Sequence, residues 1–390
     1  MNLNVLNSEI QHFINENLHL NITQLALQRN PFTTVDWIEI LSQIESKSKA
    51  KDKLPSWFST ENILYPPKIS IEQTSSESTA LYKSKLISGT NLIDLTGGLG
   101  VDDYYFSKRF QKVVHCEINT SLSQLTAHNF KQLHATNIEC ISGDSQEFLL
   151  QSTTIWDWIY IDPSRRNDQK GKVFMLKDCL PNVPSNLDFY FTKSKSILIK
   201  TAPLLDITAG LAELKHVKTI HIVALNNEVK ELLWELHKDY VRPTVLKTVN
   251  ITKNKTEVFD VPTTTSFASY GAPESYLYEP NSAIMKSGGF DAISAIFKIN
   301  KLHPNSHLYT NSTLIDFPGR SFKIIKTLPY NKLALKKELT NHKANVTTRN
   351  FPESVENIRK KWKIKEGGAT YCFFTTDMNN NKIVLICDKI

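Results

Sequence analysis

The sequence predicts an α/β protein: a doubly wound, Rossmann-like sheet, with a helical region before it and a smaller α+β module after it. Three observations lead to this prediction. The apolar residues 91–94 are followed by a glycine-rich turn and a helical pattern, which is the strand–turn–helix that opens such a sheet. Three later apolar stretches, each of strand length, end at an acidic residue. Finally, residues 320–390 differ in charge from the rest of the chain.

The composition is that of a globular cytoplasmic protein. With 390 residues, the chain has room for two or three domains, and 41% hydrophobic content suits a folded core. No apolar run approaches the roughly 20 residues that span a bilayer, and the N-terminus lacks the pattern of a signal peptide. The five cysteines form no CxxC pair, so we expect reduced thiols, no metal site and no membrane contact.

Positive charge is concentrated near the C-terminus. Residues 320–390 hold 15 Lys and Arg against 6 Asp and Glu, a balance of +9 within a formal net charge of +7, so the first 319 residues sum to −2. A basic module on a nearly neutral body indicates either a grip on a polyanion or a solvated, lysine-rich surface.

Helical spacing dominates the first 65 residues. Apolar residues recur every three or four positions around Phe13 and again around Trp37. Gln73, Ser75 and Ser76 follow, just before the first predicted strand. They are candidates for contact with a ligand at that strand, although Ser75 and Ser76 are equally suited to cap a helix.

The glycine-rich turn is the first motif that carries chemistry. Gly98 and Gly100 remove side chains where the backbone bends and comes close to a ligand, between Asp94 and the next helix. The second predicted strand ends at Glu117, 23 residues after Asp94, where a carboxylate can accept both ribose hydroxyls of an adenosine. A nicotinamide site would show G-x-G-x-x-G. Here the spacing is Asp94-x-x-x-Gly98-x-Gly100, with Thr96 where many enzymes that bind S-adenosylmethionine (SAM) have their first glycine, and no loop of pyrophosphate size is evident. Together with the later signals, this spacing favours SAM over NAD.

Two further strand ends fit a SAM site. Asp144 and Ser145 follow the third predicted strand, where the Asp144 carboxylate can accept from an adenine amino group. A buried strand then delivers Asp162-Pro163 to the carboxyl edge of the sheet, where the chemistry of such open sheets takes place. This motif resembles the D-P-P-Y and D-P-P-R motifs of nucleic-acid methyltransferases. The four signals together predict a class I SAM-dependent methyltransferase, with Gln73 at the methionine end of the cofactor.

Most of the chain resembles a family of bacterial class I methyltransferases that carry a C-terminal THUMP-like domain. The resemblance covers residues 30–120, including Asp94-Leu-Thr-Gly-Gly-Leu-Gly100, and the stretches 343–355 and 367–371. Residues 278–288 resemble the small ferredoxin-like lobe that precedes this domain in the family. Since THUMP domains bind RNA, the resemblance implies an RNA-modifying methyltransferase. We therefore expect four parts: residues 1–65 (helical region), 66–273 (methyltransferase), 274–318 (ferredoxin-like lobe) and 319–390 (THUMP-like domain).

The atom that is methylated stays open between three chemistries. Methylation of a base amino group usually has an aromatic residue at the fourth motif position, to stack the base; here that residue is Arg165. Methylation at carbon 5 of a pyrimidine needs a thiolate, and Cys179 is the nearby thiol.

Ribose 2′-O methylation is the third chemistry. Such enzymes hold a Lys–Asp–Lys–Glu tetrad in which a lysine removes the hydroxyl proton. Asp162 and Lys200 stand at matching strand ends, and Glu228 follows the next predicted strand. The second lysine would come from the set Lys68, Lys83 and Lys85. Alternatively, Lys200 binds a phosphate or pairs with an acid.

Cations follow the Asp162 motif. Arg165, Arg166, Lys170 and Lys172 suit contact with a phosphodiester backbone, unless the arginines pair with local acids such as Asp168. The sequence thus predicts a SAM-dependent methyltransferase of structured RNA (rRNA or tRNA). Alternatives are a nucleic-acid-binding protein that keeps a non-catalytic SAM fold, and a methyltransferase for a small molecule or a protein.

Overall fold

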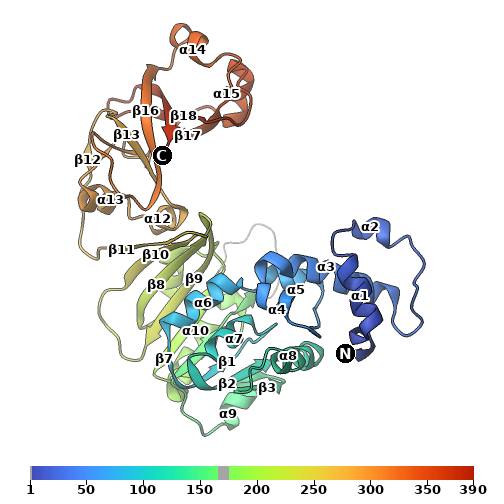
Figure 1. Ribbon diagram of the computed structural model, residues 1–390. Helices are drawn as coiled ribbons and strands as arrows, with labels where there is room; N and C mark the ends of the chain where they lie inside the picture. The colour runs from blue at the N-terminus through green and yellow to red at the C-terminus, as the bar shows by residue number, and fades with distance from the viewer. Residues whose placement is uncertain (1, 166–174) are drawn as a thin grey trace. The chain divides into compact units, whose positions relative to one another are not determined.

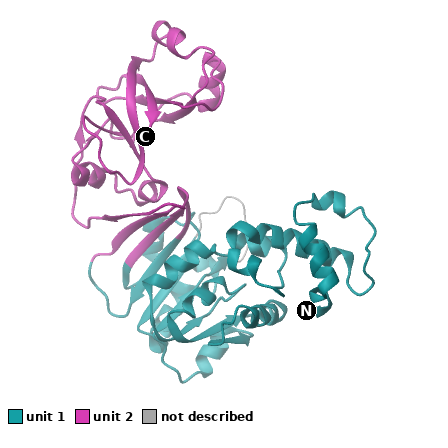
Figure 2. Ribbon diagram, in the orientation of Figure 1, with its two compact units in different colours: residues 1–218, 232–242 teal, residues 219–231, 243–390 magenta. Residues whose placement is uncertain are grey.

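The computed structural model describes residues 2–165 and 175–390. The chain forms two compact units, residues 1–218 with 232–242 and residues 219–231 with 243–390 (Figure 2). The predicted doubly wound sheet is confirmed: nine strands follow the order β11-β10-β8-β9-β7-β4-β1-β2-β3. Within the described ranges, no helix has the length and apolar character needed to cross a membrane.

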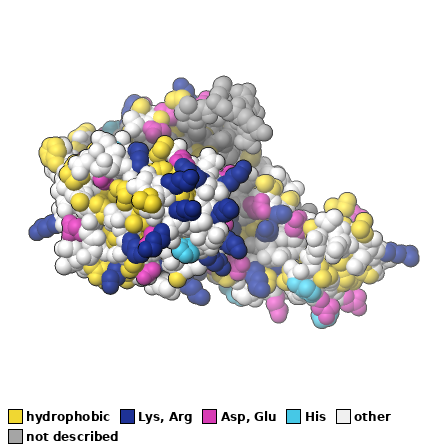
Figure 3. All heavy atoms as spheres, turned by 90° about the horizontal axis from the view of Figure 1, so that it is seen from above, with side chains coloured by type: hydrophobic (Ala, Val, Ile, Leu, Met, Phe, Trp, Pro, Cys, Tyr) yellow, Lys and Arg dark blue, Asp and Glu magenta, His cyan; other side chains and the backbone are white. Residues whose placement is uncertain are grey.

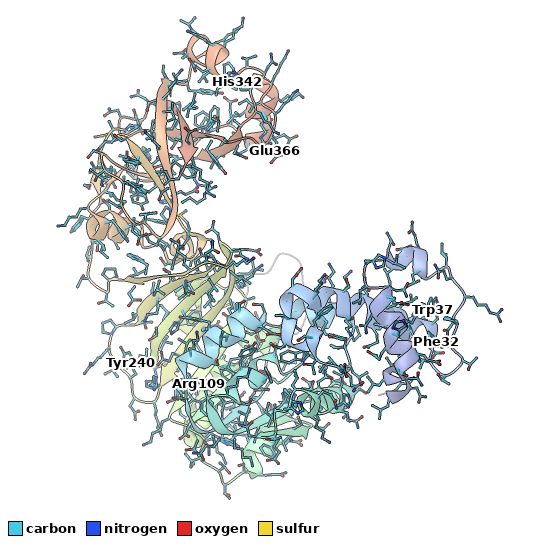
Figure 4. All side chains as sticks on the ribbon, viewed as in Figure 1. Phe32, Trp37, Arg109, Tyr240, His342 and Glu366 are labelled. Carbon is cyan, nitrogen blue, oxygen red and sulfur yellow. The ribbon has the colours of Figure 1, made fainter. Side chains whose placement is uncertain are left out.

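Short helices make up the start of the first unit, as the sequence predicts. Phe13 packs against Phe32 and Trp37, with ring centroids 5.5 and 5.8 Å apart. Figure 4 labels Phe32 and Trp37. This cluster buries Ile10, Ile14 and Ile40. The helices are η1 (Leu3–Leu6), α1 (Ser8–Glu16), α2 (Ile22–Leu25), α3 (Trp37–Lys53), α4 (Pro55–Ser59), α5 (Lys68–Gln73) and α6 (Glu77–Leu86).

The sheet is parallel over most of its width. Its strands are β1 (Gly89–Asp94), β2 (Phe110–Glu117), β3 (Ile138–Ser142), β4 (Trp158–Ile161), β7 (Ser196–Thr201), β8 (Val217–Leu225), β9 (Glu228–His237), β10 (Val245–Ile251) and β11 (Thr256–Val261). Strand β9 runs antiparallel to β7, and β11 antiparallel to β10. The helices between strands are α7 (Val101–Phe106), α8 (Thr120–Gln132), α9 (Ser145–Gln151), α10 (Val183–Lys193) and α11 (Ile207–Glu213) (Figure 1).

The strand order reverses beside β1. β1 pairs in parallel with β2 on one side and with β4 on the other, and Asp94 lies opposite His115 and Tyr160. The carboxyl ends of these strands therefore meet at one edge of the sheet, which is where open α/β sheets bind their ligands. Between β4 and α10 lie β5 (Ser164–Arg165), η2 (Leu176–Asp178) and β6 (Cys179–Leu180).

The second unit contains an eight-stranded sheet in the order β12-β14-β15-β13-β16-β19-β18-β17. Its strands are β12 (Ser269–Tyr270), β13 (Tyr276–Pro280), β14 (Asn300–Lys301), β15 (Tyr309–Asn311), β16 (Gly319–Pro329), β17 (Asn345–Arg349), β18 (Thr370–Thr376) and β19 (Lys382–Lys389). Its helices are α12 (Ser282–Ser287), α13 (Phe290–Phe297), α14 (Lys332–Leu339) and α15 (Val355–Trp362). Leu335, Ile358 and Trp362 anchor α14 and α15 in a buried cluster with Phe374. Within this unit, β16–β19, α14 and α15 belong to residues 319–390, for which the sequence predicts an α+β module.

Candidate functional site

A cavity of about 1110 Å³ lies within the first unit, at the carboxyl ends of β1, β2, β3, β4 and β7. Most of the predicted site residues line it: Gln73, Asp94, Thr96, Gly98, Glu117, Asp144, Ser145, Asp162 and Lys200. Gly100 does not line it. Arg166 and the side chain of Arg165 lie outside the described residues. Residues from six separate segments thus converge on one space, as expected for a ligand site of this topology.

The two glycines of the motif serve different purposes. Both have positive φ, +56° at Gly98 and +71° at Gly100. A Cβ on Gly98 would come no nearer than 3.9 Å to other atoms, whereas a Cβ on Gly100 would lie 2.3 Å from the Phe130 ring. Gly98 therefore leaves its surface open toward the cavity, and Gly100 allows α8 to pack beneath the turn.

Thr96 links two strand ends. Its backbone N–H and its hydroxyl donate to Asp94 Oδ1 (2.7 and 3.0 Å), and its Oγ1 accepts from the Asp162 backbone N–H (2.7 Å). Asp94 itself is only 1% exposed, and burial is the main cause that raises the pKa of its carboxyl group. These two residues set the shape of the turn and the position of Asp162.

Removing the Thr96 hydroxyl should destabilise the turn. We expect Thr96→Val to lower the free energy of unfolding by about 1–3 kcal/mol, because it leaves the Asp162 N–H without this acceptor and Asp94 without one donor. Thr96→Ser is the matched control, since it keeps the hydroxyl, and it should stay near the wild-type value. Urea unfolding of both variants measures the difference; equal stability of the valine and serine variants would contradict the role of the hydroxyl.

Glu117 joins the glycine turn to α8. Its Oε2 accepts from the Gly98 N–H (2.9 Å) and its Oε1 from the Asn119 N–H (2.7 Å). A carboxylate offers about four acceptor positions, so two stay open for hydroxyl groups in the cavity. Asp144 is exposed and caps α9 by accepting from the Gln146 N–H at 2.7 Å.

A network of buried charges lies behind Asp162. Lys200 Nζ lies 2.5 Å from Asp162 Oδ2, and it also donates to Ser75 Oγ at 3.3 Å. Ser75 in turn accepts from Lys83 Nζ (3.0 Å) and donates to Asp102 Oδ2 (2.9 Å). Lys83 lies 3.2 Å from Asp102 Oδ1, with its side chain 0% exposed. We call these five residues the lysine–aspartate network.

Sequence reasoning found only part of this network. It selected Asp162 and Lys200, named Ser75 as a candidate for a ligand contact or a helix cap, and left Lys83 as one of three candidates. Asp102 and its partner Tyr160, whose hydroxyl donates to Asp102 at 2.7 Å, were missed. The available signal was the pair of adjacent acids, Asp102 and Asp103, at the start of the helix that follows the glycine-rich turn, because at least one of them must face the sheet.

The two neighbouring aspartates of α7, Asp102 and Asp103, have pKa values shifted in opposite directions. Burial acts to raise the pKa of Asp102, but Lys83, Lys200, Tyr160 and Ser75 outweigh it and hold that pKa below the usual value. Asp103 lies 2.6 Å from His115 Nδ1. There burial raises the pKa of Asp103 and lowers the pKa of His115. Asp102 therefore stays a carboxylate, and both shifts in the second pair favour neutral forms.

Other candidates lie apart from the network. The Cys179 thiol is buried, and its Sγ donates to the Met175 carbonyl at 3.6 Å, while burial raises the pKa of the remaining buried thiols, such as Cys116. Glu228 is exposed and pairs with Lys230 at 2.7 Å. Lys68 pairs with Glu45 and Lys85 is exposed. Among the described residues, no cluster has the donor set of a metal site.

The second unit carries exposed cations on two helices. Lys332, Lys336 and Lys337 of α14 are exposed, as are Lys360 and Lys361 of α15 and Lys363 at its C-cap. Figure 3 shows Lys and Arg side chains gathered on this face, among apolar ones. Such a surface suits a polyanion.

Comparisons with known proteins agree with this architecture. Residues 319–389 match the family model of a THUMP domain-like region, and residues 276–318 that of a ferredoxin-like domain. The crystal structure of a putative methyltransferase from Porphyromonas gingivalis W83 matches over 98% of this chain and 97% of its own, with 29% identity and a TM-score of 0.88. None of the curated proteins matches at a significant level.

Two further solved structures match over part of the chain. An rRNA methylase from Streptococcus thermophilus is 14% identical over 42% of this chain and 94% of its own, with a TM-score of 0.30. The M. capricolum protein TrmK, solved with S-adenosylhomocysteine, is 15% identical over 42% of this chain and 69% of its own, with a TM-score of 0.33. The full-length match and the two domain matches confirm the expected resemblance: a methyltransferase-like fold with a ferredoxin-like lobe and a THUMP-like C-terminal domain.

Proposed function

We propose that this protein is a SAM-dependent methyltransferase that modifies RNA. The observation that carries the proposal is the convergence, on one cavity, of the glycine turn, Glu117, Asp144 and the Asp162 network. Each of these lies at the carboxyl end of a different strand, so the arrangement follows from the fold and not from a single motif. The full-length likeness to a methyltransferase-like structure supports the reaction class.

The residues present fit an S-adenosyl group. Glu117 has acceptor positions left for ribose hydroxyls, and exposed Asp144 offers an acceptor for an adenine amino group. Gly98 keeps the turn free of a side chain, and Gln73 and Ser75 lie on the wall formed by the N-terminal helices. SAM supplies a methyl group activated by a positively charged sulfur. The protein then has to hold the acceptor atom in line with that group, and such positioning supplies much of the rate.

We assign the acceptor side of the cavity to Asp162, Pro163 and Ser164; Asn182 and Asn186 also belong to the lining. RNA as the substrate rests on the THUMP-like match and on the exposed lysines of α14 and α15. These lysines would neutralise phosphates while the cavity receives one nucleotide.

Charge reversal on α14 and α15 should weaken RNA binding. For the triple variant Lys336→Glu, Lys360→Glu and Lys363→Glu, we expect at least about a tenfold lower affinity for total tRNA and a smaller salt dependence, because fewer counterions are released on binding. Filter binding at several salt concentrations measures both quantities. Binding of S-adenosylhomocysteine should stay unchanged.

The matched control reverses three exposed lysines of the first unit: Lys49, Lys51 and Lys85. Its net charge equals that of the triple variant, so it separates a specific surface from a general charge effect. An equal loss of affinity in both variants would show that the C-terminal module is not the RNA-binding surface.

A non-catalytic nucleic-acid-binding protein and a methyltransferase for another substrate are the competing functions. The discriminating experiment incubates the full chain with tritiated SAM and total RNA from cells that lack the gene, alongside DNA and protein extract. We expect label in one RNA species. Label only in protein or small molecules would overturn RNA as the substrate, and SAM binding without any label would favour the binding protein.

A further inference from the structure

Lys200 lies beside Asp162 in the lining of the cavity. Its side chain is 10% exposed, against 38% for its partner Asp162, and both line the cavity. Because only this small fraction of the Lys200 side chain is exposed, the side chain can contact an acceptor bound in the cavity while having little contact with bulk water. In such a position an amine is able to exchange a proton with a substrate group.

The network holds the Lys200 ammonium group in a fixed place. Ser75 Oγ has one proton and two acceptor positions: it donates to Asp102 and accepts from Lys83 and Lys200. The hydroxyl is therefore saturated, and its orientation is set by three partners. Tyr160 fixes Asp102 from the sheet side. Lys200 is thus positioned by β4, α6 and α7 as well as by its own strand.

Charges of both signs face Lys200. Asp162 and Asp102 favour its protonated form, whereas Lys83, which shares its acceptor Ser75, disfavours it. On β9, the register partner of Lys200 is the buried Leu233. The two lysines and two aspartates balance in charge. A cationic methyl donor in the same cavity adds a positive charge that disfavours the ammonium form of Lys200, while the carboxylates of Glu117 and Asp144 in the lining offset part of it. Of Lys83 and Lys200, only Lys200 lines the cavity. Once neutral, Lys200 is therefore the lysine that can accept a proton from a group bound there.

The same geometry bears on the two other methyl acceptors. Methylation of a base amino group would use Asp162 as the acceptor for that group; its Oδ2 is paired with Lys200 at 2.5 Å, which leaves Oδ1 for such a contact. Methylation at carbon 5 requires a thiolate in the cavity. Cys179 is buried and does not line the cavity, and Cys116, which does line it, is buried, which raises the pKa of its thiol. A hydroxyl acceptor needs a base with a lone pair, which neutral Lys200 provides.

We propose that Lys200 accepts the proton of a ribose hydroxyl in RNA, and that Lys83, Asp102 and Ser75 are the residues that position it. This inference rests on the proposed function and names its acceptor. The hydroxyl oxygen forms the bond to the methyl carbon, the carbon–sulfur bond breaks with its electron pair left on sulfur, and the hydroxyl proton passes to Lys200 Nζ. The products are a methyl ether, a neutral thioether and an ammonium group, so charge is conserved.

Alkaline hydrolysis of the labelled RNA tests the acceptor. A 2′-O-methyl group blocks cleavage of the next phosphodiester bond, so the inference predicts label in alkali-resistant dinucleotides. Label in mononucleotides would overturn the hydroxyl acceptor while leaving the RNA methyltransferase intact. RNA that takes up no label would instead contradict the proposed function, so the two failures are distinguishable.

Substitution of Lys200 distinguishes between two roles of this residue: a base that accepts the substrate proton, and a residue that binds the cofactor. We expect Lys200→Met to lower the single-turnover rate about 10²–10⁴-fold, with binding of S-adenosylhomocysteine changed by less than about threefold in equilibrium dialysis. Lys85→Met, on the exposed side of α6, is the matched control and should keep the wild-type rate. Loss of S-adenosylhomocysteine binding in Lys200→Met would overturn the inference, because it would place Lys200 on the cofactor.

Lys83 is tested as a positioning residue by the pH profile. Lys83→Met keeps the length of the buried side chain and removes a positive charge beside Lys200. The pH at which the single-turnover rate is half-maximal should then move upward by about one unit or more, because the ammonium form of Lys200 is less disfavoured. A folded Lys83→Met variant with a lower rate but an unmoved profile would contradict this role.

Discussion

Asp102→Asn should be among the most destabilising single substitutions in the first unit. Lys83 is 0% exposed and lies 3.2 Å from Asp102 Oδ1, so the asparagine removes a negative charge that lies next to a buried ammonium group. Breaking such a pair costs about 3–5 kcal/mol. Urea unfolding followed by tryptophan fluorescence measures the loss, since five of the six tryptophans lie in the first unit.

Asp103→Asn is the matched control, one residue further along α7. Its carboxyl group faces His115 in a pair whose shifts favour neutral forms, and an amide can replace a neutral carboxyl group as a hydrogen-bond partner. We expect a cost of less than about 1 kcal/mol. If Asp103→Asn proved as destabilising as Asp102→Asn, the assignment of the charged carboxylate to Asp102 would be wrong.

The pH dependence of the two variants should also differ. The raised pKa of Asp103 contributes stability below its unfolded value of about 3.9, and this contribution is lost as the pH rises through the folded pKa. The lowered pKa of Asp102 contributes stability above the unfolded value, and this is lost as the pH falls. The free energy of unfolding of Asp103→Asn, relative to that of the wild type, should therefore rise as the pH rises above about 4. For Asp102→Asn, the deficit in free energy of unfolding relative to the wild type should shrink as the pH falls below about 4.

Glu117→Ala should abolish most of the affinity for S-adenosylhomocysteine. Hydrogen bonds to a charged group contribute about 1.5–3 kcal/mol each, and two ribose hydroxyls would be lost together with the contacts to the Gly98 and Asn119 N–H groups. We expect the dissociation constant measured by equilibrium dialysis to increase by at least about 100-fold.

Glu139→Ala is the control for this substitution. Glu139 belongs to the adjacent strand β3 and pairs with Lys112 at 2.7 Å, at a half-exposed position, and it does not line the cavity. Its removal should leave S-adenosylhomocysteine binding near wild type. Unchanged binding in Glu117→Ala would remove this residue from the cofactor site.

The strand ends were predictable because they follow from local patterns. Asp94, Glu117 and Asp162 each close an apolar stretch, and a parallel sheet brings such ends to one edge. The doubly wound fold and the α+β module followed from the same patterns and from the resemblance. The placement of these residues around one cavity agrees with the expectation; their roles stay proposals.

The lysine–aspartate network was not predictable as a whole. Lys83 and Asp102 come from different helices, and no sequence spacing tells which of Lys68, Lys83 and Lys85 turns inward. The answer depends on how α6 packs on α7, which buries Lys83 and exposes Lys85. Thr96 lines the cavity, and its hydroxyl also joins Asp94 to Asp162, a structural link that no local pattern indicated.

The most direct test of the account is equilibrium dialysis of the full chain against radiolabelled S-adenosylhomocysteine, with and without excess unlabelled NAD. The account predicts one bound molecule per chain, which unlabelled SAM displaces and NAD does not. Displacement by NAD at similar concentrations, or no binding at all, would contradict the assignment of the cavity to an S-adenosyl group, and with it the proposed reaction.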